Sequence, residues 1–128
     1  MAGISTFLAH KLLDHVLRGT TYTPPTTVYM ALYTSNPGDD DSGSEVSGNG
    51  YQRQPVTFSA PSGRRIVNSN QVEFPEATGP WGTITHFGLR DAQTGGNLLF
   101  YGELTASVTI SAGQQLIFKQ GDIIVEAT

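Results

Sequence analysis

Three histidines are the first side chains in the sequence whose chemistry could serve a metal site or proton transfer. His10 and His15 lie five residues apart in a segment that we expect to be helical. At about 100° per residue they are about 140° apart around the axis. Metal-binding histidines on one helix are spaced by three or four residues instead. His86 stands alone in a predicted strand. The spacing therefore favours structural roles for all three.

A run of acidic residues provides the weak candidates for a metal site, which are Asp39, Asp41 and Glu45. An EF-hand loop that starts at Asp39 would need Asp or Asn at its fifth position, Gly at its sixth and Glu at its twelfth. The sequence has Gly, Ser and Gly there. A looser oxygen-ligand site remains open, but a solvated acidic loop is the better interpretation. We expect no metal and no cofactor.

Catalytic groups are equally hard to find. Glycoside hydrolysis needs two carboxyl groups at a fixed separation, and the spacing of Glu73, Glu76, Glu103 and Glu126 nominates no pair. The chain has no cysteine and no Gly-x-Ser-x-Gly motif, so the usual signatures of a thiol or serine nucleophile are missing. We expect that the protein is not an enzyme.

Two aromatic residues are candidates for contact with a glycan or a partner. Trp81 lies in the turn Gly-Pro-Trp-Gly, and Tyr51 follows a mobile polar loop. A tryptophan on a turn can stack on a sugar ring, but it can equally plug the end of a β-sandwich. Plugging is the better interpretation, since a single tryptophan in a small domain is usually largely buried.

Length and composition limit the classes of protein. The chain has 128 residues, of which 38% are hydrophobic and 14% charged, with a net charge of −4. This suits one domain over residues 1–128. The negative charge argues against nucleic-acid binding. No apolar run is long enough for a membrane span, and the N-terminus lacks the pattern of a signal peptide. We expect assembly in a cytoplasm.

One amphipathic helix is predicted over residues 5–18. Ser5 or Thr6 can cap its start, and Gly19 can take the left-handed position after its end. Apolar side chains recur at spacings of three and four, which gives the helix one apolar face. That face must lie on the protein's own sheet or on another subunit. The candidate oligomer contacts are therefore Ile4, Leu8, Leu12 and Val16.

The rest of the chain alternates between short strands and turns, which predicts a mainly β fold. Residues 26–34 are apolar on both faces, as in a central strand. Residues 35–50 form a long, exposed acidic loop that should be mobile unless something binds it. Residues 91–97 should make a hairpin. These features predict an antiparallel β-sandwich, of which a jelly-roll-like form is one option. The other expected strands are 53–60, 71–74, 83–90, 97–104, 107–110, 116–118 and 123–125.

Blocks of sequence along most of the chain resemble one family. Residues 12–20 read LLDHVLRGT, and residues 22–34 read YTPPTTVYMALYT. Further blocks are EVSGNGYQRQ at 45–54, VTF at 56–58, WGTITHFGL at 81–89 and TGGNLLFYG at 94–102. In this order they are similar to small tail fibre proteins of tailed bacteriophages. The segment Arg64-Arg65-Ile66 departs from the pattern, which would have small residues there.

The resemblance implies a virion component of the phage tail that is assembled in the bacterial cytoplasm. Its expected partners are other copies of itself, with a homotrimer by analogy, other phage tail proteins and host cell-surface polysaccharide. Three hypotheses follow. The first is a structural fibre subunit that contributes to host attachment by polyvalent binding. The second is a stand-alone glycan-binding module that uses Trp81, Tyr51 and the acidic loop. The third is a polysaccharide hydrolase, which no acid pair supports.

Overall fold

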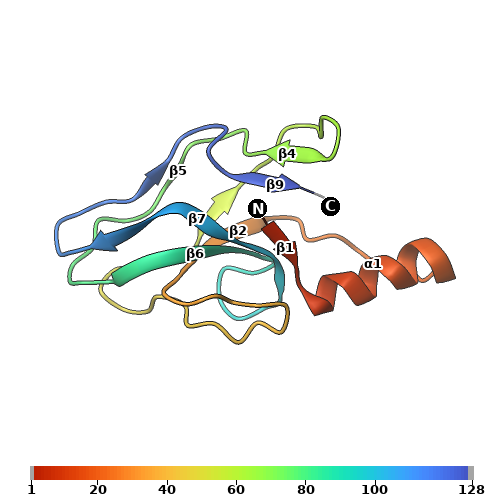
Figure 1. The fold of residues 1–128 in the computed structure, drawn as a ribbon, viewed down its shortest axis with the longest axis horizontal. Coiled ribbons are helices and arrows are strands. Elements are labelled where there is room, and N and C mark those ends of the chain that lie inside the picture. Colours follow the sequence, from red (N-terminus) through yellow and green to blue (C-terminus); the bar gives the residue numbers. More distant parts are fainter. Residues whose placement is uncertain (1, 127–128) are drawn as a thin grey trace.

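The computed structural model describes residues 2–126, which form nine strands and one helix (Figure 1). The strands are mostly short, and two long ones, β6 and β7, form the centre of the fold. The elements are β1 (Ala2–Ile4), α1 (Thr6–Arg18), β2 (Val28–Tyr33), β3 (Gln54–Val56), β4 (Arg65–Val67), β5 (Val72–Glu73), β6 (Gly82–Arg90), β7 (Leu98–Ile110), β8 (Ile117–Phe118) and β9 (Ile124–Glu126).

The strands form a sandwich-like arrangement of antiparallel sheets. The main sheet has the order β1-β7-β6-β2-β3. The opposite layer consists of two separate two-stranded ribbons, β4-β9 and β5-β8. The expected mainly β sandwich fold with one N-terminal helix is confirmed. β2 is a central strand, as its two apolar faces predict, and residues 91–97 join β6 to β7 in the expected hairpin.

The hydrophobic core fills the space between the two layers. Met30 and Leu32 of β2 and Leu89 of β6 point into it from the main sheet, and Val72 and Val125 meet them from the ribbons. All five are at most 5% exposed. Burial of this kind is the main favourable contribution to folding. The other face of the main sheet carries Tyr33, Gly88 and Arg90, and the segment after β2 lies over it.

Helix α1 is capped as the sequence predicts. The Ser5 side chain accepts a hydrogen bond from the Leu8 amide at 3.1 Å, and Gly19 ends the helix with a φ of 72°. The position of the helix differs from one expectation. Ile4 belongs to β1, where it pairs with Phe100, so it is not part of the helical stripe. No side chain of α1 is buried, and the helix projects from the β body (Figure 1).

Three further predictions differ from the structure. The expected strands 97–104 and 107–110 form one strand, β7, which pairs with β6 on both sides of a bulge. The sequence pattern did not predict β1 and β4, which are short and take their ladder bonds from distant partners, β7 and β9. The loop at 35–50 is largely exposed but is tied to the body, with Pro37 and Val46 buried.

Candidate functional site

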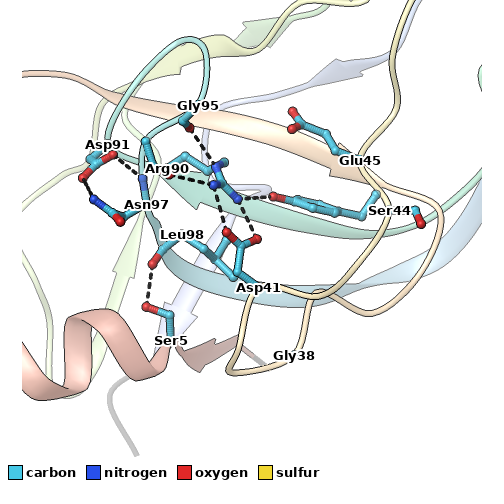
Figure 2. A network of polar contacts seen from close by, with 12 residues as sticks. Ser5, Gly38, Asp41, Ser44, Glu45, Arg90, Asp91, Gly95, Asn97 and Leu98 are labelled. Carbon is cyan, nitrogen blue, oxygen red and sulfur yellow. Dashed lines mark hydrogen bonds and ion pairs between the residues drawn. The ribbon is translucent and has the colours of Figure 1, made fainter.

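Two buried arginines hold the 35–50 loop and the 91–97 hairpin loop against the main sheet. Arg90, the last residue of β6, forms a bidentate ion pair with Asp41, with N–O distances of 2.8 and 2.9 Å (Figure 2). It also donates to the Tyr33 hydroxyl at 2.9 Å and to the Gly96 carbonyl at 3.0 Å. One guanidinium therefore joins β2, the acidic loop and the hairpin.

Arg53 makes a second clamp of the same kind. Its Nε and Nη2 atoms donate to the two oxygens of Glu45 at 2.8 and 2.7 Å. Its Nη1 atom donates to the carbonyls of Ala92 and Gly95 at 2.9 and 2.8 Å. Bidentate arginine–carboxylate pairs combine strong bonds with fixed geometry. The two arginines thus fix both loops from two directions.

Tyr51 extends the second clamp into the core. Its hydroxyl donates to Glu45 at 2.6 Å and accepts from the Leu32 amide at 3.0 Å. Its ring stacks on Phe74 with centroids 6.2 Å apart and forms a T-shaped pair with Trp81 with centroids 5.5 Å apart. A single side chain therefore links the polar clamp to the hydrophobic centre.

The charges of these groups are stable near neutral pH. Burial raises the pKa of Tyr51, and the adjacent Glu45 carboxylate raises it further, so the phenol stays neutral. The bond to Glu45 raises the pKa of Arg53. Burial alone would lower the pKa of Arg90, but its bonds to Asp41 and Tyr33 outweigh that effect and raise it. The arrangement suits fixed loops better than proton transfer.

A surface hollow of about 490 Å³ lies between the two clamped loops. Its walls come from the segments 45–48, 51–53 and 93–95, and they mix polar and apolar surface about equally. Backbone groups and the side chains of Gln52, Gln93 and Thr94 offer donors and acceptors to a polar ligand. Glu45 is the one carboxylate among the described residues that line the hollow, and Arg53 neutralises it.

The three weak metal candidates are engaged by the protein. Arg90 holds Asp41, Arg53 holds Glu45, and the Tyr101 hydroxyl donates to Asp39. Within residues 2–126 no three His, Cys, Asp or Glu side chains are grouped as a metal ion would require. The acidic run therefore serves as a set of anchors for its own loop.

The two aromatic candidates lie side by side, but largely inside the molecule. Trp81 is 6% exposed, and its indole nitrogen donates to the Asn49 carbonyl at 2.9 Å. Its ring plugs the core and offers no face to a sugar, so a contact of Trp81 with a glycan is not supported by its position. Tyr51 is half-buried and lines the hollow.

The histidines and the remaining acids are scattered. His10 and His15 lie on α1, where no side chain is buried, and His86 bonds to Thr85 at 2.8 Å within β6. Glu103 approaches His86 at 3.9 Å, and Glu126 pairs with Arg65 at 3.3 Å. The structure therefore does not bring the three histidines to a common site.

Sequence reasoning missed Arg53 and Arg90, the two residues that organise this region. A usable signal existed, because each arginine stands close to apolar strand residues, and a charged side chain in such a position must find a partner. The partners themselves could not be predicted. Asp41 lies 49 positions from Arg90 along the chain, and no local pattern links the two.

Comparison with known protein families gives a match over almost the whole chain. Residues 3–126 match the family described as podophage GP4 fiber I protein gp80. The chain belongs to this family. Among curated proteins, none matches the chain. The resemblance to phage tail fibre proteins is thus confirmed, and membership places the protein among the fibre components of a podophage tail, in association with other tail components.

α1, the one helix among residues 2–126, lacks the length and apolar character to cross a membrane.

Proposed function

We propose that the protein is a structural subunit of a podophage tail fibre and assembles as a homo-oligomer through α1. The observation that carries the proposal is the exposure of Leu12, Leu13, Val16 and Leu17 on a helix that projects from the body. Contiguous apolar patches on a folded protein mark surfaces that associate. Membership of a fibre family supports this interpretation, as does the low charged fraction of 14%.

The clamped β domain suits a structural part. Its loops are held by Arg53 and Arg90 in a fixed shape, which lets an assembly place many identical surfaces in register. We propose a homotrimer, by analogy with other phage fibres, that is assembled in the host cytoplasm and bound to other tail proteins. We also propose that the protein acts without catalysis, which its membership of a fibre protein family supports.

Incorporation into virions tests the structural role. Phage particles that lack this gene product would be complemented with the wild-type chain or with a variant that carries Leu13→Ser and Leu17→Ser on α1. We expect the wild-type chain to co-purify with the particles and the variant to be lost from them. The matched control is Lys11→Ser on the polar side of the same helix, which should be retained. Particles that never carry the wild-type chain would refute the structural role.

A second candidate function is attachment to host polysaccharide at the hollow between the clamped loops. The observation that favours it is a hollow of about 490 Å³ whose walls combine the Tyr51 ring with the amide side chains of Gln52 and Gln93. Weak binding at each copy would add up across an oligomer. Titration of host surface oligosaccharide into the wild-type chain and into Gln93→Ala tests it. Equal heats for the two proteins, or none for either, would exclude this site.

A further inference from the structure

The exposed part of α1 forms an apolar ridge made of Leu12, Leu13, Val16 and Leu17. These side chains are between 48% and 74% exposed. At about 100° per residue they occupy one side of the helix. His10 and His15 fall at the two borders of this side, and Lys11, Asp14 and Arg18 lie on the opposite side. The ridge is therefore an apolar surface bordered by two histidines.

The base of α1 is fixed to the body, so the ridge has a defined direction. The Ser5 amide donates to the Leu99 carbonyl at 2.9 Å, and the Thr6 amide donates to the Asp39 carbonyl at 2.8 Å. Thirteen residues give the helix a length of about 20 Å. In Figure 1 it points away from the strands. In this position the β body leaves the ridge exposed.

A groove of about 370 Å³ with an apolar floor and carboxylates among its lining lies on the β body between β7, β8 and β9. A bulge in β7 forms one wall. His86 pairs with Glu103 and Ile84 pairs with Val108, so residues 104–107 of β7 lie opposite Thr85 alone. Met30 and Phe87 form part of the lining, with Leu104, Leu116, Phe118 and Ile124 around them. Three carboxylates also line the groove: Glu103, Asp122 and Glu126.

We propose that the ridge of one copy docks in the groove of a second copy. This inference rests on the proposed function, because it specifies the contact through which the homo-oligomer forms. A helix with an apolar face that lies in an apolar groove is a common mode of recognition. Ridge and groove are different surfaces of the same chain, so the contact is head-to-tail, and such contacts close into rings when the rotation permits. A ring of three copies would give the expected trimer.

Charge favours a second copy as the occupant of the groove. Helix α1 carries two basic side chains and one acidic side chain, a formal charge of +1. The whole chain carries −4, so the residues outside the helix together carry −5. The charged side chains of the helix lie on the side away from the ridge, while the groove is lined by Glu103, Asp122 and Glu126. The net positive charge of the helix and the carboxylates of the groove attract each other at long range, which steers the encounter of two copies.

The area of the ridge also favours docking in a groove over helix–helix contact alone. A stable interface removes about 800 Å² from each partner. Four aliphatic side chains on one short helix supply only part of this area, so the receiving surface must enclose them. A concave groove encloses a helix on several sides. Each copy also contributes one ridge and one groove, so every copy in a ring makes the contact twice.

Cysteine cross-linking tests the inference, and the natural chain has no cysteine to interfere. The test variant carries Leu17→Cys on the ridge and Ile124→Cys in the groove; both native side chains are partly exposed. A short bis-maleimide is added to the purified full-length chain. We expect covalent dimers and trimers from the double variant, and no cross-linked product from either single variant. The matched control combines Ile124→Cys with Lys11→Cys on the polar side of α1, and it should not cross-link.

The outcomes separate this inference from the proposed function. Cross-linking of Leu17→Cys alone would mean that helices meet each other, and it would overturn docking in the groove while leaving the oligomer intact. An oligomeric wild-type chain whose double variant does not cross-link would overturn it as well. A wild-type chain that is monomeric in solution would overturn both the inference and the proposed assembly.

Discussion

Replacement of Arg53 by methionine should strongly destabilise the fold. Methionine keeps much of the apolar stem but removes four hydrogen bonds, two to Glu45 and two to the carbonyls of Ala92 and Gly95. The arginine side chain is 8% exposed and that of Glu45 is 22% exposed, so water replaces little of what is lost. Removal of one partner of such a pair costs about 3–5 kcal/mol. For a domain of this size that corresponds to a fall in melting temperature of about 10–20 °C.

Most of this loss should come from the negative charge of Glu45, which is left without a cation. Glu45→Gln should therefore be much less harmful in the Arg53→Met background than in the wild type, with a coupling energy of about 1–3 kcal/mol. The amide that replaces the carboxylate can still accept the hydrogen bond from the Tyr51 hydroxyl. Urea unfolding of the four proteins, followed by circular dichroism, gives the coupling directly.

An exposed ion pair provides the control for this cycle. Arg18 and Asp14 lie four residues apart on α1 with an N–O distance of 3.2 Å, and the Arg18 side chain is largely exposed. Arg18→Met should change the free energy of unfolding by less than about 0.5 kcal/mol. A loss at Arg53 no larger than that at Arg18, or strictly additive effects of the two substitutions at the buried pair, would refute the reasoning.

Single contacts give three further predictions. The pKa of Tyr51 is raised from 10.0 in the folded protein, so the stability that the neutral phenol contributes is complete below about pH 10 and is lost as the pH rises further. Unfolding curves at pH 8 to 11 should therefore show that the free energy of unfolding falls less steeply with pH for Tyr51→Phe than for the wild type. An equal slope for the two proteins would contradict this. Gly88→Ala would place a Cβ atom 2.7 Å from the Tyr33 ring and 2.8 Å from Leu98. Calorimetry should show that the free energy of unfolding falls by about 1–3 kcal/mol. An unchanged stability would mean that this face of the sheet is loosely packed. Ser5→Ala removes the cap of α1 and the hydrogen bond to the Leu98 carbonyl. The free energy of unfolding should fall by about 1–2 kcal/mol, and the helical signal in the circular dichroism spectrum should be reduced. An unchanged spectrum and stability would show that the cap is dispensable.

Features set by local sequence could be predicted. The helix has its capping serine and its terminal glycine within the same segment, and the 91–97 hairpin has its turn residues together. The central position of β2 follows from its apolar residues on both faces. In each of these cases the decisive interactions join residues that are close in sequence, or the composition of a single strand decides the outcome.

Features set by distant partners could not be predicted. β4 pairs with β9, where Arg65 lies opposite Glu126, 61 positions later, while its own residues resemble a basic turn. The acidic loop has the composition of a solvated, mobile loop, yet Arg53 and Arg90 fix it from elsewhere in the fold. The direction of α1 is likewise set by β7 and by the carbonyl of Asp39, and its own periodicity contains no information about that direction.

The mass of the purified chain in solution tests the central claim most directly. Sedimentation equilibrium at several concentrations would compare the wild type with the Leu13→Ser, Leu17→Ser variant and with the Lys11→Ser control. We predict a stable oligomer for the wild type and the control, with three copies as the expected number, and a folded monomer close to the 13.7 kDa of one chain for the variant. A wild-type chain that remains a monomer at the highest concentration would contradict assembly through α1.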